Sequence, residues 1–344
     1  MINIEEVKLA DEEHLNRAKG CIVGAFCGDA IGAAVEFRTD TITSEEVEKA
    51  MKMTMVGPHG ILPTQITDDG ELALCLLHGL LESPDKELNT LNIAKYYQKW
   101  IQSSPFNIGK TIGNAFNFLK TKEEFKADDV REEAKKVGDS ESNGSLMRIT
   151  PLAVYLSLIE DNKIMEEAVC AEVSLTHSNE IVQYASIAYC IAIRELINGK
   201  GRKEAYETAK NWGLSKNNEK FTEWFNLIDN RVEYNTIHRM GWVKIGFLYS
   251  FFYLLENKSY YESVSSIIQK GGDTDTNAAI VSGMIGAAEG FSKIPEDMTN
   301  KMLSCDTSLS KEPRPDFLSP FKCDLLKLIE QLFKKRPNTL TKIV

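Results

Sequence analysis

Residues 20–32, GCIVGAFCGDAIG, decide the fold because glycine recurs at every fourth position within a segment that otherwise has the apolar periodicity of a helix. Glycine costs about 1 kcal/mol in a helix interior, so a helix with this pattern needs compensation. Close approach of a second helix along the glycine ridge would supply it. The same reasoning applies to a small-residue segment that carries Gly283, Gly286 and Gly290. We therefore predict that these two helices form a tightly packed central pair.

Helical periodicity continues along the rest of the chain. Alternating strand patterns bounded by tight turns are hard to find, which favours an all-α fold. The predicted helices span 17–37, 69–81, 91–102, 109–119, 145–159, 164–176, 180–198, 222–229, 238–256, 260–269, 275–291 and 321–335.

The domain organisation follows from composition shifts along the chain. No Pro/Gly/Ser-rich linker divides the 344 residues, and we expect one domain over 1–344. The stretch 198–233 is the most polar and charged, and indicates a helical insertion at the periphery. A proline-broken loop at 313–320 precedes the predicted C-terminal helix, 321–335.

Charge and hydropathy exclude several classes of partner. The formal net charge is −10 and no run of Lys and Arg stands out, which argues against a nucleic-acid surface. Residues 1–17 are polar and acidic, unlike a secretory signal, and no apolar run reaches the length of a membrane span. Seven scattered cysteines fit reduced core thiols. We expect a cytoplasmic monomer with no membrane partner.

Two acidic segments precede predicted helices and offer the same ligand types. Gly271–Thr276 reads GGDTDT, and Thr67–Asp69 reads TDD. Carboxylates and hydroxyls at such spacing are the hard oxygen ligands that Mg²⁺ prefers. The alternative is that both are capped helix starts with acidic residues favoured by the macrodipole, and Asp68 with Glu71 also fits a capping box. Spacing alone does not show that the two segments meet.

The ordered set of motifs resembles the ADP-ribosylglycohydrolase family, which includes the dinitrogenase reductase-activating glycohydrolases and the ADP-ribosylarginine and ADP-ribosylserine hydrolases. The resemblance runs from about Lys19 to Pro295. The motifs are, in order, GDAIG at 28–32 with Glu36-Phe37, TDD at 67–69, IGKT at 108–111, SNGSLMR at 142–148, Thr176-His177 and GGDTDT at 271–276.

The resemblance implies an orthogonal helical bundle with two Mg²⁺ ions in a cleft, with Mn²⁺ as another ion that accepts this oxygen set. Carried over by position, the ligands of the dinuclear centre would come from both acidic segments, and Asp275 would bridge the two ions. These ligands are Thr67, Asp68, Asp69, Asp273, Asp275 and Thr276.

The implied reaction is metal-dependent hydrolysis of the glycosidic bond between ADP-ribose and a modified protein side chain or a small ADP-ribosyl conjugate. Glu36, Asp68 and Asp69 are the candidate catalytic residues, because carboxylates stabilise an oxocarbenium-like transition state. In the family, the position of Glu36 influences substrate entry and catalysis. Which carboxylate deprotonates the water stays open.

ADP-ribose carries a pyrophosphate, which an acidic protein can hold on backbone N–H groups at a helix N-terminus. Gly109 precedes one predicted helix, and Ser142, Asn143, Gly144 and Ser145 precede another. These residues are the candidate substrate-binding set, and the alternative is two further helix caps.

Three other polar residues belong to the same interpretation. In the family, the position of His177 lines the ADP-ribose pocket. Arg148 fits either a phosphate contact or a salt bridge inside the bundle. Asp29 is interpreted as a packing residue or as support for the ligands.

One departure concerns the acceptor. Many bacterial members have Asp-Ile-Gly where this chain has Asn107-Ile108-Gly109. An acid there could face a guanidinium, so Asn107 weakens the case for an arginine-linked substrate. Two alternatives remain open. One is a catalytically silent member that binds ADP-ribose or has a structural, crystallin-like role, and the other is a dinuclear phosphohydrolase. The complete ligand set favours an enzyme.

Overall fold

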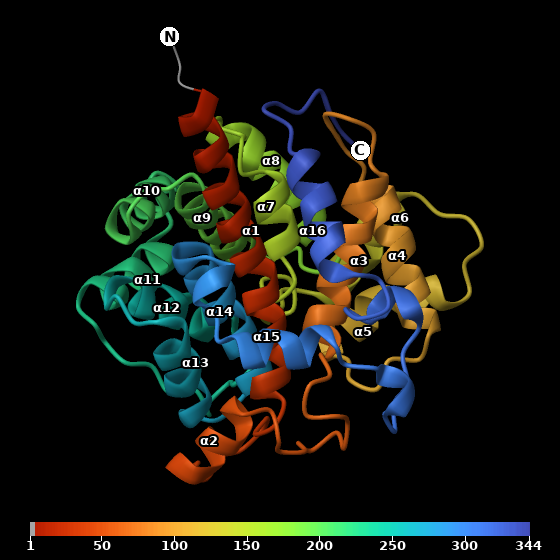
Figure 1. The fold of residues 1–344 in the computed structure, drawn as a ribbon. Coiled ribbons are helices and arrows are strands. Elements are labelled where there is room, and N and C mark those ends of the chain that lie inside the picture. Colours follow the sequence, from red (N-terminus) through yellow and green to blue (C-terminus); the bar gives the residue numbers. More distant parts are fainter. Residues whose placement is uncertain (1–3) are drawn as a thin grey trace.

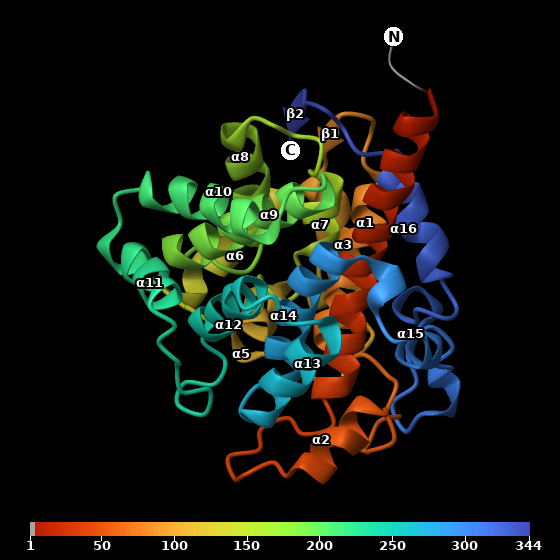
Figure 2. The same cartoon turned by 60° about the vertical axis from the view of Figure 1, so that its left-hand side comes forward.

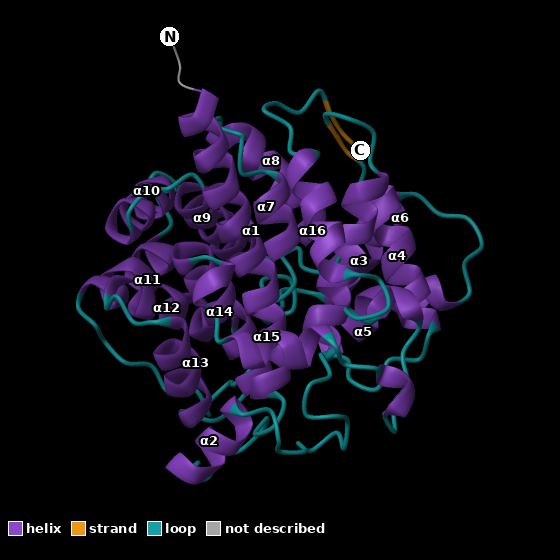
Figure 3. Ribbon diagram, viewed as in Figure 1, coloured by secondary structure: helices purple, strands orange, loops and turns teal. Residues whose placement is uncertain are grey.

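The computed structural model describes residues 4–344, so Met1–Asn3, with which the predicted domain begins, lie outside the described residues. The fold is all-α, as predicted, with one small two-stranded parallel sheet near the C-terminus (Figure 3). The elements are α1 (Ile4–Gly32), α2 (Ser44–Met51), α3 (Asp68–Glu82), β1 (Glu87–Leu88), α4 (Thr90–Gln102), α5 (Lys110–Phe116), η1 (Asn117–Lys120), α6 (Ala127–Val137), α7 (Thr150–Tyr155), α8 (Asn162–Val173), α9 (Glu180–Ile197), α10 (Arg202–Leu214), α11 (Glu219–Asp229), α12 (Val243–Leu255), α13 (Tyr260–Gln269), α14 (Thr274–Glu289), η2 (Phe291–Lys293), α15 (Glu296–Leu303), η3 (Thr307–Leu309), η4 (Asp316–Leu318), α16 (Leu325–Lys334) and β2 (Lys342–Ile343).

Helices α1 and α14 form the predicted central pair and lie side by side in both views (Figures 1 and 2). The glycines on both helices allow this close approach, because a side chain at these positions would collide with the facing helix. A Cβ atom added at Gly20 would lie 2.2 Å from the Gly286 carbonyl oxygen, and one at Gly28 would lie 2.1 Å from Ser282 Oγ. A Cβ at Gly32 would lie 2.3 Å from the Thr274 carbonyl oxygen, so the contact extends to the first turn of α14.

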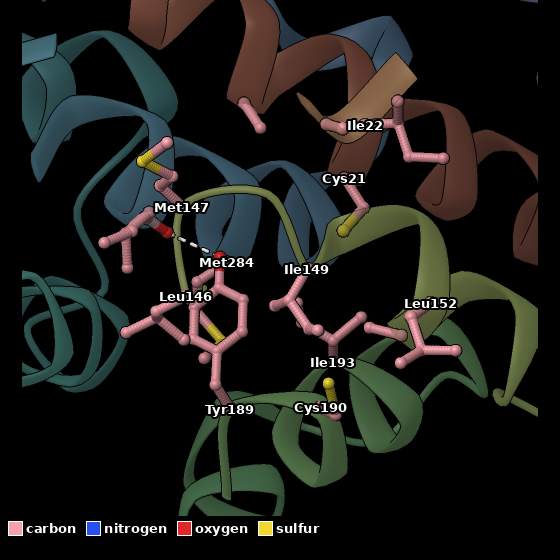
Figure 4. Packing of buried hydrophobic residues seen from close by; sticks show 14 of the residues in the cluster. Cys21, Ile22, Leu146, Met147, Ile149, Leu152, Tyr189, Cys190, Ile193 and Met284 are labelled. Carbon is pink, nitrogen blue, oxygen red and sulfur yellow. Dashed lines mark hydrogen bonds between the residues drawn. The ribbon is translucent and has the colours of Figure 1, made fainter. Parts of the chain in front are cut away.

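Around this pair the core is continuous, and Figure 4 shows part of it. Cys21 and Ile22 of α1 are buried near Ile149 and Leu152 of the α7 region. On α9, the Tyr189 hydroxyl donates a 2.6 Å hydrogen bond to the Ile280 carbonyl oxygen of α14. All seven cysteines are free thiols, as predicted. Within residues 4–344, the helices lack the combination of length and apolar character that a membrane span requires.

The predicted helix at 145–159 is the largest error. Only Thr150–Tyr155 is helical, and residues 143–149 form a series of turns. Pro151 lies in the first turn of this short helix. Proline has no N–H to bond the carbonyl four residues earlier, so a helix that ran through from residue 145 would lose that hydrogen bond. Arg148 also donates a hydrogen bond from Nη1 to the Gly144 carbonyl oxygen at 3.0 Å, which closes the turn. The segment 142–145 is therefore a loop and not the start of a helix.

Other observed helix limits differ from the predicted ones, mainly where charged residues interrupt the apolar pattern. Helix α1 begins at Ile4, well before the predicted residue 17, and ends at Gly32, so Glu36 lies in the turn that follows. The segment predicted at 238–256 becomes helical only at Val243, and the C-terminal helix begins at Leu325 because residues 320–324 form turns. The sequence prediction missed α2, α6 and α15, which are short and rich in charged residues.

Candidate metal centre and substrate cleft

The first acidic segment is held in place by a buried carboxylate from the central helix. Asp29 of α1 accepts hydrogen bonds from the Thr67 backbone N–H at 3.0 Å, the Thr67 hydroxyl at 2.8 Å and the Gly70 N–H at 2.9 Å. These bonds fix the entry into α3 and leave the side chains of Asp68 and Asp69 free of capping roles. Asp29 thus supports the candidate ligands, as interpreted from the sequence.

The second acidic segment is held by its backbone. Gly271 and Gly272 have φ angles of 71° and 83°, in the left-handed region that favours glycine. A Cβ at Gly272 would lie only 2.2 Å from the Thr236 carbonyl oxygen. The Phe37 N–H donates to the Gly272 carbonyl at 2.7 Å, and the Gly272 N–H donates to the Arg38 carbonyl at 2.8 Å. This backbone pairing places the turn that contains Glu36 beside the start of α14.

The two segments meet. The Thr276 hydroxyl lies 3.3 Å from Asp69 Oδ2, and the Thr67 hydroxyl lies 3.5 Å from Asp275 Oδ2. Carboxylate oxygens form two close groups in which every pair of atoms lies within 4.8 Å. Asp275 belongs to both groups, the position that a bridging ligand would occupy. The groups are Asp29, Asp69 and Asp275, and Glu36, Asp273 and Asp275.

Helix capping does not account for these acidic residues. Thr67 and Asp273 occupy the N-cap positions of α3 and α14, yet neither makes a side-chain capping hydrogen bond. The expected capping box at Asp68 is also absent. Glu71 instead accepts hydrogen bonds from Trp100 Nε1 at 2.7 Å and from Arg314 Nε at 2.6 Å. The capping alternative is therefore wrong for both segments.

Burial and mutual repulsion raise the pKa values of the clustered aspartates. Burial is the main cause at each one, and neighbouring carboxylates add to it. The pKa of Asp68 is raised to about 8, with Glu36 as its strongest charged neighbour. The pKa values of Asp69 and Asp275 are raised well above the usual range for the same reasons. Such a cluster favours a bound cation, which stabilises the charged forms.

One buried carboxylate oxygen, Asp69 Oδ1, is suited to bind a metal ion. Asp69 Oδ1 has no hydrogen-bond partner anywhere in residues 4–344, although the side chain is buried. An unpaired buried carboxylate oxygen is costly, and a metal ion is the group that best satisfies an oxygen surrounded by other acids. The donor set, with hydroxyls and carboxylates from both helix starts, therefore fits a hard divalent cation.

The acidic cluster lines a cleft of about 220 Å³. Asp68, Asp69, Asp273, Asp275 and Thr276 line it together with Glu36. Most of the candidate substrate-binding residues line the same cleft. Those that line the cleft are Gly109, Ser142, Asn143 and Gly144.

The loop at Ser142–Gly144 is fixed by contacts to Gly241 and Trp242 and to Asp273 of the acidic cluster. The Asn143 N–H donates to the Gly241 carbonyl oxygen at 3.0 Å, and Ser142 forms an antiparallel bridge with Trp242. Asn143 Nδ2 donates to Asp273 Oδ2 at 2.7 Å. The loop thus takes its shape from tertiary contacts and not from a helix N-terminus.

Ser145, Arg148 and His177 lie behind the cleft wall. The Ser142 hydroxyl and His177 Nε2 are 2.7 Å apart, and burial lowers the pKa of His177 to about 3, so the ring is neutral. Ser145 is fully buried. Arg148 is fully buried in an ion pair with Glu172 at 2.8 Å, which confirms the salt-bridge interpretation and rules out a phosphate contact. These residues support the loop and do not line the cleft.

Several cleft residues are outside the predicted substrate-binding set, although Phe37, Lys110 and Thr111 lie within the motifs quoted above. Phe37, Lys110, Thr111 and Gly241 line the cleft. His59 lies at its edge, with Nε2 2.7 Å from Glu36 Oε2. It belongs to an irregular Gly-Pro-His-Gly loop with no periodicity, and only the folded chain brings it to Glu36.

The family model described as ADP-ribosylglycohydrolase matches residues 10–339, nearly the whole chain. The chain belongs to the ADP-ribosylglycohydrolase family. Membership assigns it to the enzymes that hydrolyse a glycosidic bond of ADP-ribose, as the sequence resemblance predicted.

Relatives agree with this assignment over most of their length. Protein L543 of Acanthamoeba polyphaga mimivirus, assigned as an ADP-ribosyl glycohydrolase, is 26% identical over 314 residues, which cover 85% of this chain and 92% of the viral protein. The ADP-ribosyl-[dinitrogen reductase] glycohydrolase of Rhodospirillum rubrum is 25% identical over 299 residues, or 87% of this chain and 93% of that protein. A solved structure described as an ADP-ribosylglycohydrolase-related protein complex has the same fold, with a TM-score of 0.70, 19% identity and coverage of 94% and 99% of the two chains.

Proposed function

We propose that this ADP-ribosylglycohydrolase is Mg²⁺-dependent and releases intact ADP-ribose from an ADP-ribosylated protein side chain or a small ADP-ribosyl conjugate. The observation that supports this most is the meeting of the two acidic helix starts. Thr276 of one lies 3.3 Å from Asp69 of the other, beside a buried carboxylate oxygen that has no partner in residues 4–344.

The residues that would hold the metal come from both helix starts, and two ions, Mg²⁺ or Mn²⁺, suit the number of carboxylates. Bound there, the metal would supply Lewis acidity and a template for the substrate hydroxyls. The proposed ligands are Thr67, Asp68, Asp69, Asp273, Asp275 and Thr276.

The chain's own residues would support bond cleavage by charge. As the bond to the distal ribose breaks, positive charge develops on the ring, and nearby carboxylates stabilise it. Glu36, Asp68 and Asp69 line the cleft and are the catalytic candidates. A base for the attacking water would be one of the same carboxylates, kept in its charged form by the bound cation.

Gly109 and the Ser142–Gly144 loop would bind the ADP portion through backbone and amide groups. Gly109 is open to the cleft, since a Cβ added there would meet nothing within 4 Å. The Ser142–Gly144 loop is pinned to Gly241 and offers polar groups without a net positive charge. His177 would act indirectly, by holding this loop through Ser142. Ser145 is fully buried and its hydroxyl makes no hydrogen bond within residues 4–344, so it would contribute by packing.

Substrate panels test the proposal. The purified chain is incubated with ADP-ribosylarginine, ADP-ribosylserine and O-acetyl-ADP-ribose, with Mg²⁺ or with EDTA, and the products are separated by chromatography and weighed by mass spectrometry. We expect Mg²⁺-dependent release of intact ADP-ribose from at least one conjugate, and background release by Asp275→Asn.

Three results would contradict the proposal. Full activity of Asp275→Asn would exclude the dinuclear mechanism. Release of AMP would indicate a phosphohydrolase, and no release from any conjugate would favour a silent binding protein.

A further inference from the structure

His59 makes the contacts of a residue that is built into the cleft edge. It lies on the loop between α2 and α3, and its Nε2 atom is 2.7 Å from Glu36 Oε2. The side-chain amide of Asn107 lies 3.2 Å from the same nitrogen. The ring sits between two aromatic side chains, with centroids 6.2 Å from Phe37 and 5.9 Å from Phe106. Contacts from four neighbours leave the imidazole little freedom.

Glu36 depends on this contact for its orientation. Its side chain is buried, and the bond to His59 is the only hydrogen bond that its carboxylate makes within residues 4–344. On the other side, Glu36 has carboxylate oxygens of Asp273 and Asp275 within 4.8 Å. Like charges at that distance repel, so Glu36 would turn away unless an opposing group held it.

The backbone beside Glu36 is also constrained. Phe37 has a φ of 62°, in the left-handed region that is uncommon for a bulky residue. Its N–H is bonded to the Gly272 carbonyl at 2.7 Å, which fixes the main chain but not the Glu36 side chain. The hydrogen bond to Glu36 raises the pKa of His59 and so favours the imidazolium form that opposes the carboxylate charge.

We propose that His59 is a positioning residue, which holds the Glu36 carboxylate at the edge of the acidic cluster. This inference rests on the proposed function, because the position of Glu36 matters only if Glu36 takes part in hydrolysis. The alternative is that His59 ties the loop before α3 to the end of α1 and serves stability alone.

Two substitutions separate these roles. His59→Leu removes the hydrogen bond, whereas His59→Gln keeps an N–H donor of comparable reach. Activity is measured on whichever of the three conjugates the wild-type chain hydrolyses fastest. We expect His59→Leu to lower kcat by at least ~10-fold with KM changed less than ~3-fold, the pattern of a lost transition-state interaction. His59→Gln should recover most of that loss.

A double-mutant cycle gives the sharper readout. In a Glu36→Gln background, His59→Leu should lower kcat by less than about 2-fold, since coupled residues do not act additively. His78→Leu is the matched control. His78 also bonds through Nε2, 3.1 Å from the Phe317 carbonyl, and stacks on Tyr96, but it lies outside the cleft lining. This control should lower the melting temperature and leave kcat unchanged.

The outcomes separate this inference from the proposed function. No release of ADP-ribose by the wild-type chain overturns both. An active wild type with unchanged kcat in His59→Leu overturns the inference alone. The inference also fails if His59→Leu lowers kcat equally with and without the Glu36 carboxylate.

Discussion

The two acidic helix starts meet in one acidic cluster, but they are held by different means. The start of α3 is held by a side chain, because the Asp29 carboxylate accepts three hydrogen bonds from Thr67 and Gly70. The start of α14 is held by its main chain, through left-handed backbone at Gly271 and Gly272, of which Gly272 pairs with the turn after α1.

This difference has consequences for charge and for tolerance to substitution. The Asp29 clamp adds one more buried acid beside the ligands, so it fixes geometry at an electrostatic cost that a cation would offset. The glycine anchor adds no charge, but it leaves no space for a side chain. Substitution at Asp29 should therefore lower stability and activity moderately, whereas substitution at Gly272 should lower both severely.

Gly272→Ala should have the largest effect. A methyl group there would meet the Thr236 carbonyl at 2.2 Å, and left-handed backbone costs alanine about 1–2 kcal/mol. We expect the free energy of unfolding to fall by at least ~2 kcal/mol and ADP-ribose release to fall at least ~100-fold. Denaturant unfolding and initial rates measure the two effects.

Gly199→Ala is the matched control for this change. Gly199 has the same φ of 83°, but a Cβ there would meet nothing within 4 Å. This variant should lose about 1 kcal/mol of stability from backbone strain and keep its activity. Equal activity losses in the two variants would show that strain, and not the position of the α14 start, explains the result.

Asp29→Asn should have an intermediate effect on the α3 half. An amide keeps the shape but replaces one of the two acceptor oxygens with a donor. The Thr67 N–H, which both oxygens share, then loses one of its two contacts, and the remaining bonds lose the strengthening by a charged acceptor. We expect a loss of about 1–3 kcal/mol in stability. Activity should fall ~10–100-fold, as for other partners that orient metal ligands. Urea unfolding and steady-state rates measure these losses.

Glu289→Gln provides the comparison for Asp29→Asn. Glu289 also accepts a backbone N–H, from Tyr260 at 2.8 Å, and pairs with Arg202 at 2.9 Å, but it lies at the far end of α14. It should lower stability without changing the rate of hydrolysis. A wild-type rate in Asp29→Asn would contradict the clamp.

The smallest effect concerns pH and Mg²⁺. Asp68 in the folded chain holds a proton up to about pH 8, whereas an unfolded aspartate releases it near its ordinary pKa of about 4. The folded chain therefore binds more protons in this window, and its stability falls as the pH rises. Metal binds the deprotonated form, so added Mg²⁺ should raise the melting temperature more near pH 8 than near roughly pH 6. NaCl at matched ionic strength is the control, and a pH-independent gain would contradict this view.

Much of the architecture could be predicted from local patterns. The glycine spacing at Gly20–Gly32 identified the central pair because only close helix packing compensates such a helix. The two acidic segments were also visible, since ligand types and helix starts are local features. The helices predicted from periodicity at 180–198 and 260–269 agree with the observed limits of α9 and α13.

The remaining features depend on contacts between distant segments. The sequence predicts a helix from residue 145 because the apolar residues of this segment follow a helical pattern. In the structure, residues 145–149 form turns whose apolar side chains are buried, and Pro151 is the local signal against a helix. His59 carries no pattern, and its role follows only from its distance to Glu36. The sequence could not distinguish a capped helix start from a ligand segment, because the capping bonds, or their absence, exist only in the folded chain.

The central claim is that the two helix starts form one shared metal site, and counting bound Mn²⁺ by electron paramagnetic resonance tests it most directly. Mn²⁺ accepts the same oxygen ligands as Mg²⁺ and is visible by this method. We predict two ions per chain in the wild type and loss of tight binding of both in either Asp69→Asn or Asp275→Asn. Retention of one tightly bound ion in each variant would show two independent sites and contradict the account.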